Sequence, residues 1–151
     1  MAKAGEIRVI ALGLIRDGDR FANAKGDRIF VSEGYDPVKQ ETFYRALGGG
    51  VEFGETSHAA LKREFQEEIQ AELKNIKYLG CIESLFTFNG KQGHEIIQLY
   101  QCDFVDSKFY ELESLIFSES QHHKHKALWI DISRFESGEL RLVPEVFFEY
   151  L

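Results

Sequence analysis

A glycine run followed by an acidic segment constrains this chain more than any other feature. Residues 48–68 contain four glycines and five glutamates, and the second half of this segment has the pattern of a helix. Glu64, Glu67 and Glu68 lie at i, i+3 and i+4, so a helix places their carboxylates within an arc of roughly 100°. Like charges at this spacing repel by ~0.2–0.5 kcal/mol, which indicates a bound cation. Oxygen donors of this kind suit Mg²⁺ or Mn²⁺.

The spacing of these residues resembles the Nudix box, G-x5-E-x7-R-E-U-x-E-E-x-G-U, in which U is an aliphatic residue. Gly49 and Glu55 take the first two fixed positions, and Arg63 to Glu68 match the central R-E-U-x-E-E with a phenylalanine at U. Gly48 fits a common extension of the motif. Gln70 stands where the family has a glycine, so we predict that the helix continues for part of a turn beyond it.

The resemblance to Nudix hydrolases, the MutT-like enzymes, covers roughly residues 7–135. It implies a three-layer α/β/α sandwich around a mixed β-sheet. It also implies a metal-dependent enzyme that cleaves a pyrophosphate bond in a nucleoside diphosphate linked to another group. The length suits one domain, so residues 1–151 are expected to form a single Nudix hydrolase domain.

The resemblance also implies roles for the residues of the box. Glu64, Glu67, Glu68 and the carbonyl oxygen of Gly48 are expected to hold Mg²⁺ or Mn²⁺. Arg63 is expected to serve catalysis by orienting these carboxylates. Glu64 is one of two candidates for the general base that takes a proton from the attacking water.

Several residues outside the central R-E-U-x-E-E of the box are further candidates for the site, and most of them have two interpretations. Glu95, at the start of a predicted strand, is either the general base or a further metal ligand, or else a solvated strand end. His94 either contacts substrate or lies in a solvated loop. Arg45 either binds a substrate phosphate or pairs with a nearby carboxylate. Glu52 and Glu55 are expected to support the site, one sharing a metal and the other holding the box arginine or backbone N–H groups.

The residues around the box also predict local structure. Thr56 and Ser57 are candidate helix N-caps, because a hydroxyl oxygen can accept from the first N–H groups of a helix. A stripe that begins at Leu61 and recurs every four residues, through Leu73, is predicted to face the core. Strands are predicted over 7–15, 28–32, 77–88, 95–104 and 129–130, with turns or loops at 34–37 and 89–93, short helices from about 131 and 144, and no element over 106–127.

Composition limits the partners. The net charge is −7 and the sequence pI is about 5.3, so the sequence predicts a small nucleotide-type substrate and no passive binding to nucleic acid or anionic membrane. No run approaches the ~20 apolar residues of a membrane span. Cys81 and Cys102 lie in predicted strands and are interpreted as buried free thiols of a cytoplasmic protein. The sequence allows a homodimer.

Other interpretations stay open at this point. His122-His123-Lys124-His125 is interpreted as a solvated loop, because no further ligand follows at a zinc-site spacing. Phe86 stands where family members that prefer ADP-ribose often have a proline, so oxidised nucleoside triphosphates, ordinary nucleotides and sugar nucleotides all remain candidate substrates. The alternatives to an enzyme are a Nudix-fold module that senses a nucleotide without cleaving it, and a protein that binds a cation only for structure.

Overall fold

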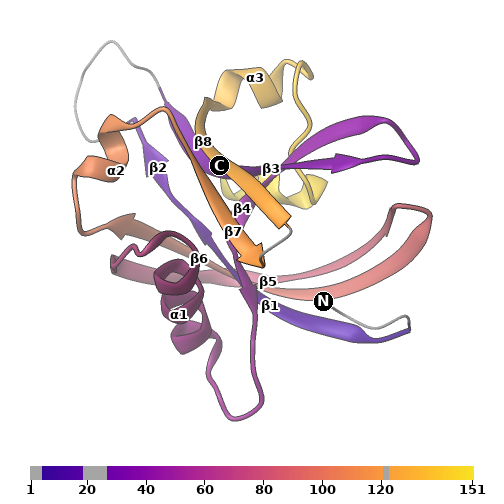
Figure 1. Cartoon of the computed structure of the whole chain (residues 1–151), viewed down its shortest axis with the longest axis horizontal. Helices are drawn as coiled ribbons and strands as arrows, with labels where there is room; N and C mark the ends of the chain where they lie inside the picture. Colours follow the sequence, from indigo (N-terminus) through magenta and orange to yellow (C-terminus); the bar gives the residue numbers. More distant parts are fainter. Residues whose placement is uncertain (1–4, 19–26, 121–122) are drawn as a thin grey trace.

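The computed structural model describes residues 5–18, 27–120 and 123–151. In chain order its elements are β1 (Ile7–Leu14), β2 (Arg16–Asp17), β3 (Arg28–Asp36), β4 (Glu41–Gly50), α1 (Ser57–Ile69), β5 (Leu73–Phe88), β6 (Lys91–Phe104), α2 (Lys108–Glu111), β7 (Ser114–Ser120), β8 (His123–Asp131), α3 (Ile132–Glu136) and the 3₁₀ helix η1 (Glu145–Tyr150) (Figure 1). None of the helices in these ranges is long and apolar enough to cross a bilayer.

The strands of the described residues form an eight-stranded mixed sheet in the order β5-β6-β1-β4-β3-β8-β7, with β2 paired to β3. β1 runs parallel to β6 and antiparallel to β4. Buried side chains form two clusters, one with α1 and the other with α3 and η1. The predicted α/β/α sandwich around a mixed sheet is confirmed.

β1 shows how the sheet separates the two clusters. Ala11 packs in the α1 cluster, whereas Ile10 and Leu12 pack in the cluster with α3 and η1. Successive side chains of a strand point to opposite faces, so a strand covered on both sides must be apolar at every position. The predicted strand over 7–15 is present as β1, and it is buried on both faces from Ile10 onward, while Ile7 is exposed.

α1 begins as the sequence predicts. The hydroxyl oxygen of Thr56 accepts a hydrogen bond from the N–H of Ala59 at 3.1 Å, which caps the helix. Leu61, Phe65 and Ile69 are all buried, so the predicted apolar stripe faces the core.

The end of α1 differs from the prediction. The helix stops at Ile69, because Gln70 adopts the left-handed conformation with φ 53° and ψ 41°. Its N–H donates to the carbonyl of Gln66 at 3.0 Å. Gln70 therefore closes the helix in the conformation that favours the family's glycine. The turn brings Ala71 and Leu73 into the core, where both are buried.

The β5–β6 hairpin is tighter and longer than predicted. Asn89 and Gly90 alone make the turn, and both have positive φ, at 52° and 74°. This geometry is typical of a two-residue hairpin turn, whose twist matches that of the strands. The predicted loop over 89–93 is therefore wrong in extent, and Glu95 lies well inside β6.

The β3–β4 hairpin is joined to the β5–β6 hairpin at its tip. The prediction of a turn over 34–37 is wrong in extent, because β3 runs to Asp36.

The buried carboxylate of Asp36 accepts hydrogen bonds from the N–H groups of Val38 at 3.0 Å and Lys39 at 3.2 Å. Burial raises the pKa of Asp36, but bonds from the backbone N–H groups of Lys39, Asn89 and Val38 outweigh this and leave it below its ordinary value. Because Asn89 belongs to the other hairpin, Asp36 links the two tips.

Two further contacts join the hairpins. The ammonium group of Lys39 donates to the carbonyl of Thr87 at 2.9 Å. The rings of Phe43 and Phe88 lie edge to face, with centroids 5.8 Å apart. Both hairpins extend to the same side of the molecule (Figure 1).

The segment 106–127 contains elements that the sequence pattern did not predict. It forms α2, β7 and the first part of β8, so Trp129-Ile130 is not a separate short strand but part of β8. β7 is an edge strand that buries Phe117 but exposes the apolar Ile116. Because apolar residues stand on both faces, the sequence does not show the alternation of apolar and polar residues that would predict a strand. The predicted loop at His122–His125 is wrong for residues 123–125, which begin β8, while His122 lies outside the described residues. The short helices expected near 131 and 144 are present as α3 and η1.

The two cysteines differ in their surroundings. Neither cysteine forms a disulfide bond, and Cys102 is buried as predicted. Cys81 is exposed, so the prediction was wrong for this residue. It lies in β5, the other edge strand of the sheet, next to an irregularity in the pairing near Tyr78.

Candidate functional site

The three glycines at the end of β4 lie close to neighbouring groups. Gly48 has a φ of 147°, and an added Cβ would collide with the carbonyl oxygen of Ala11. At Gly49 an added Cβ would overlap the carboxyl group of Glu64. Glycine is required at position 48, because its φ and the approach of the Ala11 backbone exclude a side chain, whereas at position 49 a side chain would displace the Glu64 carboxyl group. The glycine run thus brings a bare strand against the acidic face of α1.

Arg63 connects this strand to α1 and to the loop before it. Its Nη2 donates to the carbonyl oxygen of Gly50 at 2.9 Å. Its Nε and Nη2 donate to the two carboxylate oxygens of Glu55 at 2.8 and 2.9 Å. Glu55 also accepts the N–H of Glu52 at 3.1 Å. The expectation that one of these two glutamates holds the box arginine and a backbone N–H group is confirmed for Glu55.

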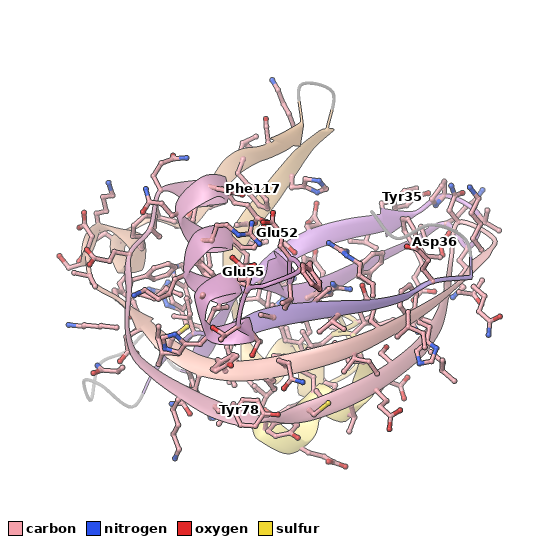
Figure 2. All side chains as sticks on the ribbon, turned by 90° about the horizontal axis from the view of Figure 1, so that it is seen from below. Tyr35, Asp36, Glu52, Glu55, Tyr78 and Phe117 are labelled. Atoms are coloured by element: carbon pink, nitrogen blue, oxygen red, sulfur yellow. The ribbon has the colours of Figure 1, made fainter. Side chains whose placement is uncertain are left out.

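The same guanidinium group holds two of the predicted metal ligands. Nη1 of Arg63 lies 3.0 Å from Oε1 of Glu64 and 3.2 Å from Oε2 of Glu67. Glu52 is a more distant partner, at 3.7 Å. Glu52 and Glu55 lie beside α1, far from Asp36 at the hairpin tip (Figure 2).

The electrostatics of this acidic cluster, which we define as Glu52, Glu55, Glu64 and Glu67 around Arg63, are unbalanced. Hydrogen bonding to Arg63 and then to the N–H of Glu52 lowers the pKa of Glu55 to about 2. The same bond to Glu55 is the largest cause of the raised pKa of Arg63. Arg63 pairs with all four glutamates, so the formal charge of the cluster is four negative charges and one positive charge, a net −3. Such a cluster attracts a cation.

The donor set fits a hard divalent cation chemically. Glu64 and Glu67 present carboxylate oxygens, and Glu68 lies half-buried on the same helix at i+4 from Glu64. Carboxylate oxygens and a backbone carbonyl such as that of Gly48 are the ligands that Mg²⁺ and Mn²⁺ prefer. In the described ranges no three acidic, histidine or cysteine side chains converge on one point. In this structure the carboxylates of Glu64 and Glu67 both contact the guanidinium group of Arg63.

Glu95 belongs to a second charged cluster, the basic cluster of Arg8, Arg45 and Glu95. Its Oε1 lies 3.0 Å from Nη1 of Arg45, and its Oε2 lies 3.8 Å from Nη1 of Arg8. The side chain of Glu95 is only 7% exposed. The alternative that Glu95 is a solvated strand end is therefore wrong. The interpretation of Arg45 as the partner of a nearby carboxylate holds, and this carboxylate is Glu95.

Sequence reasoning missed Arg8 entirely. It lies directly opposite Glu95, because β1 pairs in parallel with β6 in this register. Its position just before an apolar run resembles that of any charged residue at a strand end. Only the strand pairing identifies Arg8 as a neighbour of Glu95.

The two clusters approach the glycine run at neighbouring residues. The α-carbon of Gly49 faces Glu64, whereas an added Cβ at Gly50 would lie 3.3 Å from Nη2 of Arg8. Glu95 contacts Arg45 and Arg8, whereas Glu64 and Glu67 contact Arg63. His94 is half-buried and, as the neighbour of Glu95 in β6, points to the other face. The structure thus brings Arg45 and Glu95 together, but not His94.

Comparison with known proteins agrees with this arrangement. The family model of the NUDIX domain matches residues 11–149. The NAD-capped RNA hydrolase NudC of Pseudomonas syringae pv. tomato is 38% identical over 56 residues, which are 37% of this chain and 19% of that protein. The chain thus aligns with about a fifth of the length of this relative.

Solved structures show the same fold. A NUDIX hydrolase from Nitrosomonas europaea superimposes with a TM-score of 0.61 at 16% identity, covering 95% of this chain and 85% of that one. A MutT NUDIX hydrolase from Burkholderia pseudomallei gives a TM-score of 0.57 at 20% identity, covering 85% of each chain. Because the domain model spans nearly the whole chain, and the box glutamates surround Arg63 beside the glycine run, the chain belongs to the Nudix family.

Proposed function

We propose that this protein hydrolyses the pyrophosphate bond of a nucleoside diphosphate linked to another group, with Mg²⁺ or Mn²⁺ as the metal. The observation that carries the proposal is the acidic cluster, in which one arginine faces four glutamates beside the bare backbone of Gly49. Nudix hydrolases generally use divalent metal ions. A polyphosphate is itself anionic, so an acidic protein needs a cation to bind it.

Each residue of the box has a part in the proposed reaction. Glu64, Glu67, Glu68 and the Gly48 carbonyl oxygen would hold the metal. A bound divalent metal lowers the pKa of water and offsets the charge of phosphate oxygens. Glu64 would take the proton of the attacking water, because Arg63 and the close backbone of Gly49 keep its carboxylate in one place. The leaving group is a phosphate or phosphoester, which needs little protonation near neutral pH.

Glu95 is left out of this ligand set. Both of its oxygens face guanidinium groups, those of Arg45 and Arg8. That Glu95 is a metal ligand or the general base stays a prediction, which the variant Glu95→Gln tests.

The substrate is proposed as a class and not as one compound. NudC is named for hydrolysis of NAD-capped RNA, and NAD joins two nucleosides through a pyrophosphate. A net charge of −7 favours a small nucleotide over an RNA chain for the present protein. We place the protein in the cytoplasm, because both of its cysteines are free thiols.

A panel of nucleoside triphosphates, oxidised nucleotides, sugar nucleotides and dinucleotides, assayed by chromatography for the nucleotide and phosphate-bearing products of pyrophosphate-bond cleavage, tests the proposal. Turnover should vanish with EDTA and return with Mg²⁺ or Mn²⁺. Glu67→Gln and Glu68→Gln should each lower kcat by ~10²-fold or more, because a neutral amide is a poor ligand for a hard cation. Glu72→Gln, an exposed glutamate beyond α1, is the matched control and should keep full activity.

Two outcomes would contradict the proposal. Turnover that persists in EDTA would remove the metal from the mechanism. Nucleotides that raise the melting temperature without being cleaved would indicate the sensing module instead.

A further inference from the structure

We infer that Arg8 and Arg45 bind a phosphate group of the substrate, and that Glu95 is the positioning residue that holds both guanidinium groups. The identity of the ligand as a substrate phosphate rests on the proposed function. The contacts of the basic cluster support the inference independently.

The charges of the basic cluster point to an anion. Two guanidinium groups share one carboxylate, so the formal charge of the cluster is two positive charges and one negative charge, a net +1. The side chain of Glu95 is 7% exposed, whereas those of Arg8 and Arg45 are 34% and 26% exposed. The carboxylate therefore lies beneath the two arginines, whose guanidinium groups remain accessible from solvent.

The arginines also keep hydrogen-bond donors for a ligand. A guanidinium group carries five N–H donors in a planar fork that matches the oxygens of a phosphate. Arg45 directs two nitrogens at Glu95, at 3.0 and 3.5 Å. Arg8 contacts Glu95 through an ion pair of 3.8 Å and makes no hydrogen bond within the described ranges. A phosphate is the anion that best uses such donors.

The basic cluster borders the acidic cluster at one residue. The α-carbon of Gly50 faces Arg8, and its carbonyl oxygen accepts from Arg63 of the acidic cluster. A pyrophosphate that carries a divalent cation has both signs of charge within one small group. The metal suits the acidic cluster and a phosphate suits the basic one, so the two clusters together are complementary to this class of ligand.

The positions of both arginines are set by strands and not by loops. Arg8 is placed by the pairing of β1 with β6, and Arg45 by β4. The tip of the β3–β4 hairpin is in turn bonded to the β5–β6 hairpin through Lys39 and Thr87. The strands therefore fix the backbone positions from which both arginines reach the ligand.

Arg8→Ala tests the inference in two ways. In the hydrolysis assay it should raise KM by about tenfold or more, with kcat changed less than about threefold, since the arginine binds and does not react. In EDTA, inorganic pyrophosphate titrated into the full chain by calorimetry should bind about tenfold more weakly than to the wild type. Arg8→Lys should recover part of the affinity, because it keeps the charge but loses the fork.

Glu95→Gln separates a positioning role from that of a base. As a positioning residue, its loss should raise KM and weaken pyrophosphate binding, while the acidic limb of the pH–rate profile and the metal concentration for half-maximal rate stay as in the wild type. Arg134→Ala is the matched control, since this arginine pairs with Glu139 on the surface. It should change none of these quantities. Thermal melts confirm that each variant is folded.

Opposite results would overturn the inference. If Arg8→Ala and Arg45→Ala keep wild-type KM and wild-type affinity for pyrophosphate, the basic cluster serves only the fold. If Glu95→Gln flattens the acidic limb with KM unchanged, Glu95 is the base. If pyrophosphate binding depends on Arg8 but no nucleotide is hydrolysed, the proposed function fails while this inference stands.

Discussion

Arg63 donates two hydrogen bonds to Glu55, from Nε and Nη2 to the two carboxylate oxygens at 2.8 and 2.9 Å. This bidentate pair ties α1 to the loop that follows the glycine run, and it holds the guanidinium group so that Nη1 faces Glu64 and Glu67. The orientation of the acidic cluster therefore depends on a glutamate outside the proposed ligand set.

The pair predicts a pH-dependent stability. The pKa of Glu55 in the folded protein is about 2, below its ordinary value of 4.5. Its ionised form therefore stabilises the fold fully above pH ~4.5, and this contribution is lost as the pH falls toward 2. We expect Glu55→Gln to melt below the wild type at pH 7, and the gap to shrink between pH 4.5 and 2. Glu139→Gln, which breaks an exposed pair, is the control. A gap independent of pH would contradict the prediction.

Arg63→Lys should lower kcat by about 10- to 100-fold, because supporting residues of a metal site have effects of this size. A lysine ammonium group cannot bond Glu55, Glu64 and the Gly50 carbonyl oxygen at once. KM for the nucleotide should change little, since Arg63 does not contact the basic cluster. Lys62→Arg, the reverse change at the adjacent exposed position, should leave steady-state kinetics unaltered. Full activity in Arg63→Lys would show that the bidentate geometry is dispensable.

Gln70→Gly should raise the free energy of unfolding by about 0.5–1 kcal/mol. A non-glycine residue in the left-handed conformation costs ~1–2 kcal/mol, and part of the gain is offset because glycine is freer in the unfolded chain. Gln66→Gly, at an exposed position inside the same helix, should instead destabilise by about 1 kcal/mol. Urea denaturation measures both. Destabilisation by Gln70→Gly would show that its side chain, which donates to the Glu67 carbonyl, outweighs the backbone strain.

Iodoacetamide at pH 8 should label Cys81 and spare Cys102 in the folded protein. Burial raises the pKa of Cys102 to about 12, so its thiol stays protonated, and reagent cannot reach it. Mass spectrometry should show one adduct on the native chain and two after denaturation. Cys81→Ser should show none on the native chain. Equal labelling of both thiols would mean that the core opens near Cys102.

Local periodicity explains why α1 was predicted closely. The positions of Leu61, Phe65 and Ile69, the cap at Thr56 and the pairing of Arg63 with Glu67 all follow from 3.6 residues per turn. These contacts join residues that are near one another in sequence. The end of the helix was missed because glutamine, unlike the family's glycine, rarely adopts the left-handed conformation that Gln70 has in the structure.

The sequence by itself determined the Nudix box, the helix that carries its glutamates and the apolar strand of β1. Only the tertiary structure decided that Glu95 is buried between Arg8 and Arg45, and that β7 and β8 form within a polar segment. The physical reason is the range of the contacts. A helix satisfies its hydrogen bonds within one segment, but a strand takes its neighbours from distant parts of the chain. The register between strands is determined only when the sheet assembles, and the register decides which residues lie next to each charged side chain.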